Sequence, residues 1–227
     1  QADGGLHHGE VRIMRSRFDG QLALLNKDLI EMGAMCEEAI DACIKYLICG
    51  DVSMKEAAIE GEKLIDRKEQ EIENICMRLL TLQQPVAGDL RTVSSALKMI
   101  SDMERIGDQA SDIAEIAEYA QKGDLGKTHI ADMAQATKKM VTESVDSFVK
   151  KDIEKAQDVI KSDDIVDDLF IKVKQELIKA IQNNDGDAEA LVDMLMIAKY
   201  FERIGDHAVN VAEWVIYSLT GIHAESN

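Results

Sequence analysis

Acidic side chains recur every fourth residue in two stretches of the chain that match each other. Both stretches contain the pentapeptide Glu-Arg-Ile-Gly-Asp, which begins at Glu104 and again, 98 residues later, at Glu202. Side chains four residues apart lie on one face of a helix, so each stretch presents a row of acids. Carboxylate oxygens bind hard cations, and such a row could therefore hold a metal ion. The rows comprise Glu104, Asp108 and Asp112 in the first stretch and Glu202, Asp206 and Asn210 in the second.

A second acidic row precedes each stretch. Like charges four residues apart destabilise a helix by about 0.2–0.5 kcal/mol per pair, and a single row is most simply a solvated acidic face. Four rows in matching positions favour metal binding instead. The earlier rows are Glu62, Asp66, Glu69 and Glu73 in the first half, and Asp163 and Asp167, followed by Phe170 and Lys174, in the second. We expect Glu62 and Asp66 to face Glu104 and Asp108, and Asp163 and Asp167 to face Glu202 and Asp206. The second site has fewer acids and is expected to bind metal more weakly or to hold a smaller cluster.

A glycine and an arginine accompany each acidic row. Gly107 and Gly205 lie inside helical segments, where glycine costs about 1 kcal/mol relative to alanine, so close packing against a backbone or ligand is expected there. Arg105 and Arg203 adjoin the rows. The simplest role for each arginine is an ion pair with a neighbouring carboxylate. The alternatives are holding a metal ligand in place or contacting phosphate.

The composition restricts the possible partners. The chain has 227 residues and a net charge of −17, which argues against binding to nucleic acids or anionic membranes. A cation or a basic protein surface is compatible with this charge. There is no apolar run long enough to span a membrane and no visible signal peptide, so a cytoplasmic protein without membrane insertion is expected. The four cysteines form no CxxC pair and are expected to be reduced core residues: Cys36, Cys43, Cys49 and Cys76.

Apolar residues at three- and four-residue spacing predict an all-α protein of six long helices. The predicted ranges are 21–49, 53–82, 89–121, 128–150, 152–183 and 187–220, with Pro85 and Gly123 in the breaks. A capping box of Ser53 and Glu56 is expected to begin the second helix. Asp152 is expected to begin the fifth helix and Asp187 the sixth. Matching segments about 100 residues apart indicate two tandem antiparallel three-helix bundles related by internal duplication. The predicted units are a disordered or artificial lead-in (1–20), two repeats (21–123 and 124–221) and a tail (222–227).

Three motifs together resemble the PhoU family of phosphate-transport regulators. They are Gln84-Pro-Val-Ala-Gly-Asp-Leu-Arg91, Met103-Glu-Arg-Ile-Gly-Asp-Gln-Ala110 and Phe201-Glu-Arg-Ile-Gly-Asp-His-Ala208. The resemblance extends over nearly the whole chain from about Met14. It implies two symmetry-related three-helix bundles that bind metal at E/D-xxx-D motifs, in some members as multinuclear clusters.

The resemblance also implies a role and partners. The family represses the phosphate-starvation response and restrains phosphate uptake, together with the ATPase of the phosphate ABC transporter and a sensor histidine kinase. A homodimer is expected. The metal is left open among divalent and ferric ions, with iron, manganese, magnesium, calcium and zinc as candidates.

The rival interpretation is a carboxylate-bridged di-metal enzyme built on a helical bundle. Such enzymes use Glu-x-x-His pairs that point into the bundle, and no Glu-x-x-His occurs in this sequence. No nucleophile and base combination is evident either. A purely structural scaffold would explain the helices but not the duplicated pentapeptide, so we expect a metal-binding adaptor that is not an enzyme.

Overall fold

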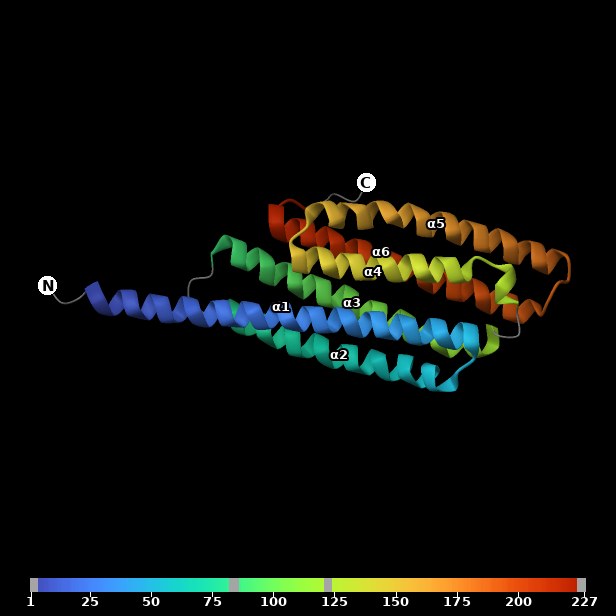
Figure 1. The fold of residues 1–227 in the computed structure, drawn as a ribbon, viewed down its shortest axis with the longest axis horizontal. Coiled ribbons are helices and arrows are strands. Elements are labelled where there is room, and N and C mark those ends of the chain that lie inside the picture. Colours follow the sequence, from blue (N-terminus) through green and yellow to red (C-terminus); the bar gives the residue numbers. More distant parts are fainter. Residues whose placement is uncertain (1–3, 82–85, 121–123, 224–227) are drawn as a thin grey trace.

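The described residues of the computed structural model, 4–81, 86–120 and 124–223, contain six α-helices, one short 3-10 helix and no strand (Figure 1). This confirms the predicted all-α class. The helices are α1 (Gly4–Cys49), α2 (Val52–Thr81), α3 (Ala87–Ala120), η1 (Leu125–Lys127), α4 (Ile130–Lys150), α5 (Ile153–Gln182) and α6 (Ala188–Thr220).

Two three-helix units lie side by side, α1 to α3 and α4 to α6, as the internal duplication predicted (Figure 1). α3 and α6 pack against each other in the middle of the molecule, and α1 also contacts α4. α2 and α5 lie at opposite edges of the assembly. Each edge helix therefore packs mainly on its own unit, α2 on α1 and α3, and α5 on α4 and α6.

The core follows the apolar seams of α3 and α6. Burying a Met, Ile, Val or Phe side chain contributes about 1.5–3 kcal/mol, so these seams hold the two units together. In α3 the buried seam comprises Ala96, Met99, Met103, Ile106, Ala110, Ile113 and Ala117, and in α6 it comprises Met194, Ile197, Phe201, Ile204, Ala208, Val211 and Val215. Three of the four cysteines, Cys36, Cys43 and Cys76, are buried as predicted, whereas Cys49 is exposed.

Side chains cap two helices as the sequence predicted and one differently. Asp152 Oδ1 accepts from the backbone N–H of Lys155 at 3.0 Å, and the Asp187 carboxylate accepts from that of Glu189 at 3.0 Å. The Ser53 capping box was wrong. Asp51 Oδ1 accepts from both the backbone N–H and the hydroxyl of Ser53, at 3.0 and 2.7 Å, so α2 begins before Ser53. A carboxylate two residues earlier competes for the same free N–H groups.

The first helix begins at Gly4 and not at Gln21, which corrects the predicted disordered segment. Phe18 is buried and continues the apolar row of α1 toward its start. Arg15 Nη1 donates to Asp89 Oδ2 at 2.8 Å, and the same oxygen accepts from the backbone N–H of Val86 at 3.2 Å. Residues 15–20 therefore belong to the first repeat. The predictions for residues 1–3, Pro85, Gly123 and the tail at 224–227 fall outside the described residues.

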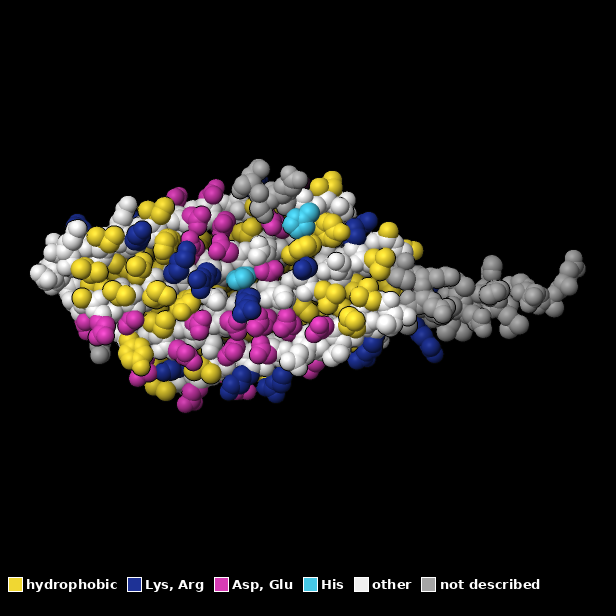
Figure 2. Space-filling view, turned by 180° about the vertical axis from the view of Figure 1, so that it is seen from behind, with side chains coloured by type: hydrophobic (Ala, Val, Ile, Leu, Met, Phe, Trp, Pro, Cys, Tyr) yellow, Lys and Arg dark blue, Asp and Glu magenta, His cyan; other side chains and the backbone are white. Residues whose placement is uncertain are grey.

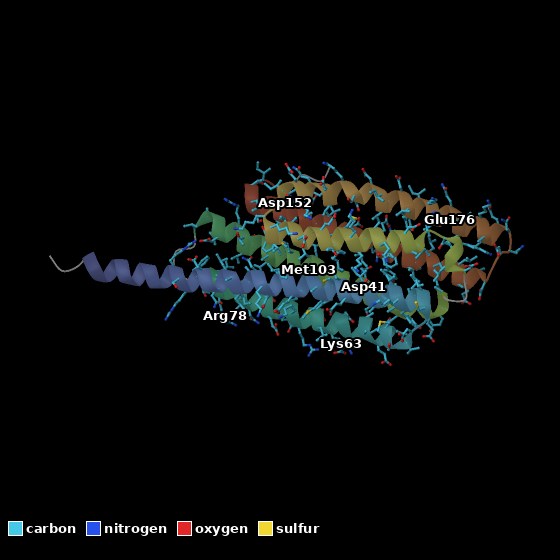
Figure 3. All side chains as sticks on the ribbon, viewed as in Figure 1. Asp41, Lys63, Arg78, Met103, Asp152 and Glu176 are labelled. Carbon is cyan, nitrogen blue, oxygen red and sulfur yellow. The ribbon has the colours of Figure 1, made fainter. Side chains whose placement is uncertain are left out.

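A salt bridge also links the two units. Asp41 on α1, labelled in Figure 3, accepts from the ammonium of Lys138 on α4, at 2.7 Å for Oδ1 and 2.9 Å for Oδ2. None of the described helices is long and apolar enough to cross a lipid bilayer.

Candidate metal centres

The first acidic cluster lies between α2 and α3 and consists of Glu62, Asp66, Glu69, Glu104 and Asp108. Asp66, Glu104 and Asp108 each place one carboxylate oxygen within 4.8 Å of the other two. The carboxylate of Glu62 adjoins that of Asp108 and accepts from the Ser111 hydroxyl. The earlier and later rows of the first half therefore face each other, as the spacing of the acids predicted.

Mutual repulsion and burial make the charged state of this cluster costly. Burial, and next the neighbouring Asp108 carboxylate, raise the pKa of Glu104 to about 7. Burial and nearby carboxylates also raise the pKa values of Glu62 and Glu69 above their usual range. A cation between these groups would reverse the repulsion that raises the pKa values.

The second acidic cluster lies between α5 and α6 and consists of Asp163, Asp167, Glu202 and Asp206. Burial, and then the carboxylates of Asp167 and Asp206, raise the pKa of Asp163 to about 6. Burial and the Glu202 carboxylate likewise raise the pKa values of Asp167 and Asp206. The rows of the second half thus also face each other. On the face of the molecule drawn in Figure 2, acidic side chains gather near the middle, with Lys and Arg side chains among them.

One oxygen of the second cluster has no hydrogen-bond partner among the described residues. Asp163 Oδ1 is buried and accepts no hydrogen bond from the described part of the chain. A buried carboxylate oxygen without a partner is costly, and a bound cation would satisfy it. Both clusters offer only oxygen atoms as ligands, which fits magnesium, calcium, manganese or iron. Zinc, which is more often bound through nitrogen or sulfur, fits them less well.

Two of the expected ligands at the ends of the rows are turned toward the contact between α3 and α6. Asn210 Nδ2 donates to Asp102 Oδ1 at 2.9 Å, and His207 Nδ1 lies 2.9 Å from the same oxygen. Asp112 adjoins Asp108 but also feels the charge of Arg203 on α6. The structure therefore places Asn210 outside the second acidic cluster, and it places Asp112 between the first cluster and α6.

The two arginines differ in their contacts. Arg105 Nη1 donates to Asp108 Oδ2 at 3.0 Å, and its Nε lies 3.5 Å from Glu104 Oε2. This matches the simple ion-pair interpretation. The guanidinium of Arg203 instead lies 6.0 Å from the centre of the Tyr200 ring, which is a cation–π distance.

The two helical glycines also differ. A Cβ at Gly107 would lie 2.8 Å from Ile65 Cδ1, so α2 approaches α3 closely there, as expected. A Cβ at Gly205 would lie 3.5 Å from both Asp163 Oδ1 and Val166 Cγ1, which is an ordinary contact. An added methyl group would therefore be crowded at Gly107 and tolerated at Gly205.

Two residues of these sites were missed by the sequence analysis. Glu69, which stands in the predicted 62–73 row, adds a carboxylate beside Asp66 and Glu104. Ser111 donates to Glu62, and Lys199 forms an ion pair with Glu202 within the second acidic cluster. No spacing rule pointed to Ser111 or Lys199.

The fold and the two clusters define a class of protein: a duplicated three-helix unit in which each copy carries a cluster of facing carboxylates. The model of the PhoU domain matches residues 29–117 and 130–215, which correspond to the two units. The chain belongs to the PhoU family.

Named relatives match most of the chain. A homologue of phosphate-specific transport system accessory protein PhoU from Clostridium acetobutylicum is 37% identical, over 94% of this chain and 99% of that protein. The Pseudomonas aeruginosa homologue is 30% identical, over 96% of this chain and 90% of that protein.

Solved structures share the fold. The crystal structure of PhoU from Pseudomonas aeruginosa matches with a TM-score of 0.84 at 30% identity, over 90% of this chain and all of that chain. The phosphate transport system regulatory protein PhoU from Streptococcus pneumoniae matches with a TM-score of 0.85 at 25% identity, over 92% of this chain and all of that chain.

Proposed function

We propose that this protein is a metal-binding adaptor of the cytoplasm that restrains phosphate uptake and represses the phosphate-starvation response. It acts with the ATPase subunit of the phosphate ABC transporter and with a phosphate-sensing histidine kinase, and it is not an enzyme. Membership of the PhoU family supports this role, as do relatives named as accessory proteins of phosphate-specific transport. The Streptococcus pneumoniae neighbour is named as a regulatory protein.

The observation that carries the metal-binding part is the convergence of Asp66, Glu104 and Asp108. Their oxygens lie within 4.8 Å of one another although burial and repulsion oppose the charge of Glu104. Divalent or ferric ions, with magnesium, manganese and iron foremost, would neutralise both clusters and tie α2 to α3 and α5 to α6. Because a ligand that binds the folded state stabilises it, the loaded protein would present a more rigid surface to its partners, which is the simplest physical basis for an adaptor. The proposed adaptor acts as a homodimer.

Elemental analysis tests the metal-binding part. The protein, purified without chelator, is compared with a variant carrying Asp66→Asn, Glu104→Gln, Asp108→Asn, Asp163→Asn, Glu202→Gln and Asp206→Asn. The control carries Glu60→Gln, Glu118→Gln and Asp158→Asn, whose side chains are more than half exposed. We expect stoichiometric metal in the wild type and the control, and loss in the cluster variant. Equal metal in all three proteins would refute the assignment.

Gene deletion tests the regulatory part. In phosphate-rich medium, deletion of the gene should raise expression of phosphate-starvation genes, and the wild-type gene should restore repression. Unchanged expression would count against the regulatory role. Co-purification of the tagged protein with the transporter ATPase and the sensor kinase would test the partners directly.

A further inference from the structure

The two acidic clusters differ at one pair of facing positions. The offset of 98 between the pentapeptides places Lys199 of α6 where Ser101 stands in α3. The offset of 101 between Glu62 and Asp163 places Phe170 of α5 where Glu69 stands in α2. A carboxylate facing a hydroxyl in the first repeat is thus replaced by an aromatic ring facing an ammonium in the second.

Lys199 is held inside the second cluster by two contacts. Its ammonium forms an ion pair with Glu202, and its Nζ lies 5.1 Å from the centre of the Phe170 ring. Its positive charge also attracts the carboxylates of Asp167 and Asp206. The ammonium therefore acts on three of the four carboxylates that would bind a metal ion.

The first cluster has no ammonium at the corresponding place. Glu69 contributes a further carboxylate there and accepts from the Ser101 hydroxyl. Arg105 does pair with Asp108, but its side chain is 61% exposed at the edge of the cluster. The first cluster thus offers five carboxylates, whereas the second offers four and supplies a cation of its own.

We propose that Lys199, with Phe170 beneath its ammonium, is a built-in counter-ion that makes the second cluster the weaker of two metal sites. Resting on the proposed function, this inference assigns an order: divalent cations fill the first cluster first. A cation enters the second only when the ammonium leaves Glu202. The Lys199 side chain is 43% exposed and can turn into solvent. The second cluster is therefore the one whose occupancy follows the available metal concentration.

Titration calorimetry with Mn²⁺ on chelator-treated protein tests this inference. The second cluster is isolated by closing the first with Asp66→Asn and Glu104→Gln. In that background, Lys199→Ser should tighten Mn²⁺ binding about tenfold, because one charge-assisted contact no longer competes. Lys199→Met, which keeps the stem over Phe170 without the charge, should act in the same direction. Adding Phe170→Glu to Lys199→Ser should bring the affinity close to that of the first cluster.

The control is Lys161→Ser on α5, which makes the same change in net charge at a side chain that is 74% exposed and pairs with Asp158. If Lys199→Ser and Lys199→Met bind Mn²⁺ no more tightly than Lys161→Ser, while the first cluster binds normally, the role of Lys199 is overturned and the proposed function stands. If no variant and no wild-type cluster binds Mn²⁺ or another divalent cation, both are overturned. Circular dichroism verifies that each variant is folded.

Discussion

Gly107 and Gly205 occupy matching positions in the two repeats but meet different neighbours. At Gly107 an added methyl group would lie 2.8 Å from Ile65 Cδ1, whereas at Gly205 the nearest atoms would lie 3.5 Å away. Identical sequence in the two pentapeptides therefore does not imply an identical structural requirement. The difference arises because Ile65 in α2 is replaced by the smaller Val166 in α5.

Alanine at these two positions should have opposite effects on stability. Gly107→Ala should lower the free energy of unfolding by about 1–3 kcal/mol, because the buried Ile65 must shift. Gly205→Ala should leave it unchanged or raise it by up to about 1 kcal/mol, because alanine is the better helix former and no atom is displaced. Urea denaturation of both variants and the wild type measures this. A similar loss in both variants would contradict the distinction.

Glu104 makes the stability of the metal-free protein depend on pH. Its pKa is raised to about 7 in the folded state from a usual value of 4.5. Between these values the folded state binds more protons than the unfolded state, so the free energy of unfolding falls as the pH rises. The stabilisation is complete below about pH 4.5 and is lost as the pH passes 7. The pKa of Asp163, raised to about 6, acts in the same direction.

Urea denaturation of chelator-treated protein between pH 5 and 8 should show this fall, and Glu104→Gln should make the dependence shallower. Metal ions compete with protons for the same oxygens, so Mn²⁺ affinity should increase over the same range. Stability that rises from pH 5 to 8 in the absence of metal would show that the carboxylates do not repel one another as the structure indicates.

Among the helices, α1 and α4 approach closely where Gly33 faces Val145. A Cβ at Gly33 would lie 2.7 and 2.9 Å from the two methyl carbons of Val145. A β-branched side chain inside a helix has one strongly preferred rotamer, so Val145 cannot turn away easily. This glycine therefore sets the distance between the two repeats on the side where Asp41 pairs with Lys138.

A double-mutant cycle should reveal this contact. Gly33→Ala is expected to lower the free energy of unfolding by about 1–3 kcal/mol through overpacking. In a Val145→Ala background the same change should cost much less, because the colliding methyl groups are gone. Equal costs of Gly33→Ala in both backgrounds, measured by urea denaturation, would place the strain elsewhere.

The elements and their facing rows were largely predictable because they depend on local periodicity. Six helices, two caps, both apolar seams and the helix faces that carry the acids follow from spacing within single helices. The features that were missed depend on neighbours from other helices. Asn210 turns to Asp102 across the contact of α3 with α6, and Arg15 ties the first part of α1 to Asp89 of α3. Nothing in the spacing of one helix specifies such partners.

At the scale of the whole molecule, the duplication does not produce two independent domains. α3 and α6 make the most extensive helix–helix contact in the described part of the chain, and each belongs to a different repeat. Polar contacts reinforce this apolar interface, since Asp102 of α3 binds His207 and Asn210 of α6. A repeat separated from its partner would expose its largest buried seam to water.

The metal-free protein should therefore unfold in one cooperative transition. Trp214, the only tryptophan, lies in α6, so its fluorescence reports on the second repeat. Circular dichroism follows the helical content of both repeats, and coincidence of the two signals is a test of two-state unfolding. We expect the urea midpoints from the two signals to coincide. Asp102→Ala, which leaves His207 and Asn210 without their partner, should lower both midpoints together, at a cost of about 1–3 kcal/mol. Separate midpoints, with tryptophan fluorescence changing at a different urea concentration, would show that each repeat folds on its own and that the seam between α3 and α6 is only an assembly contact.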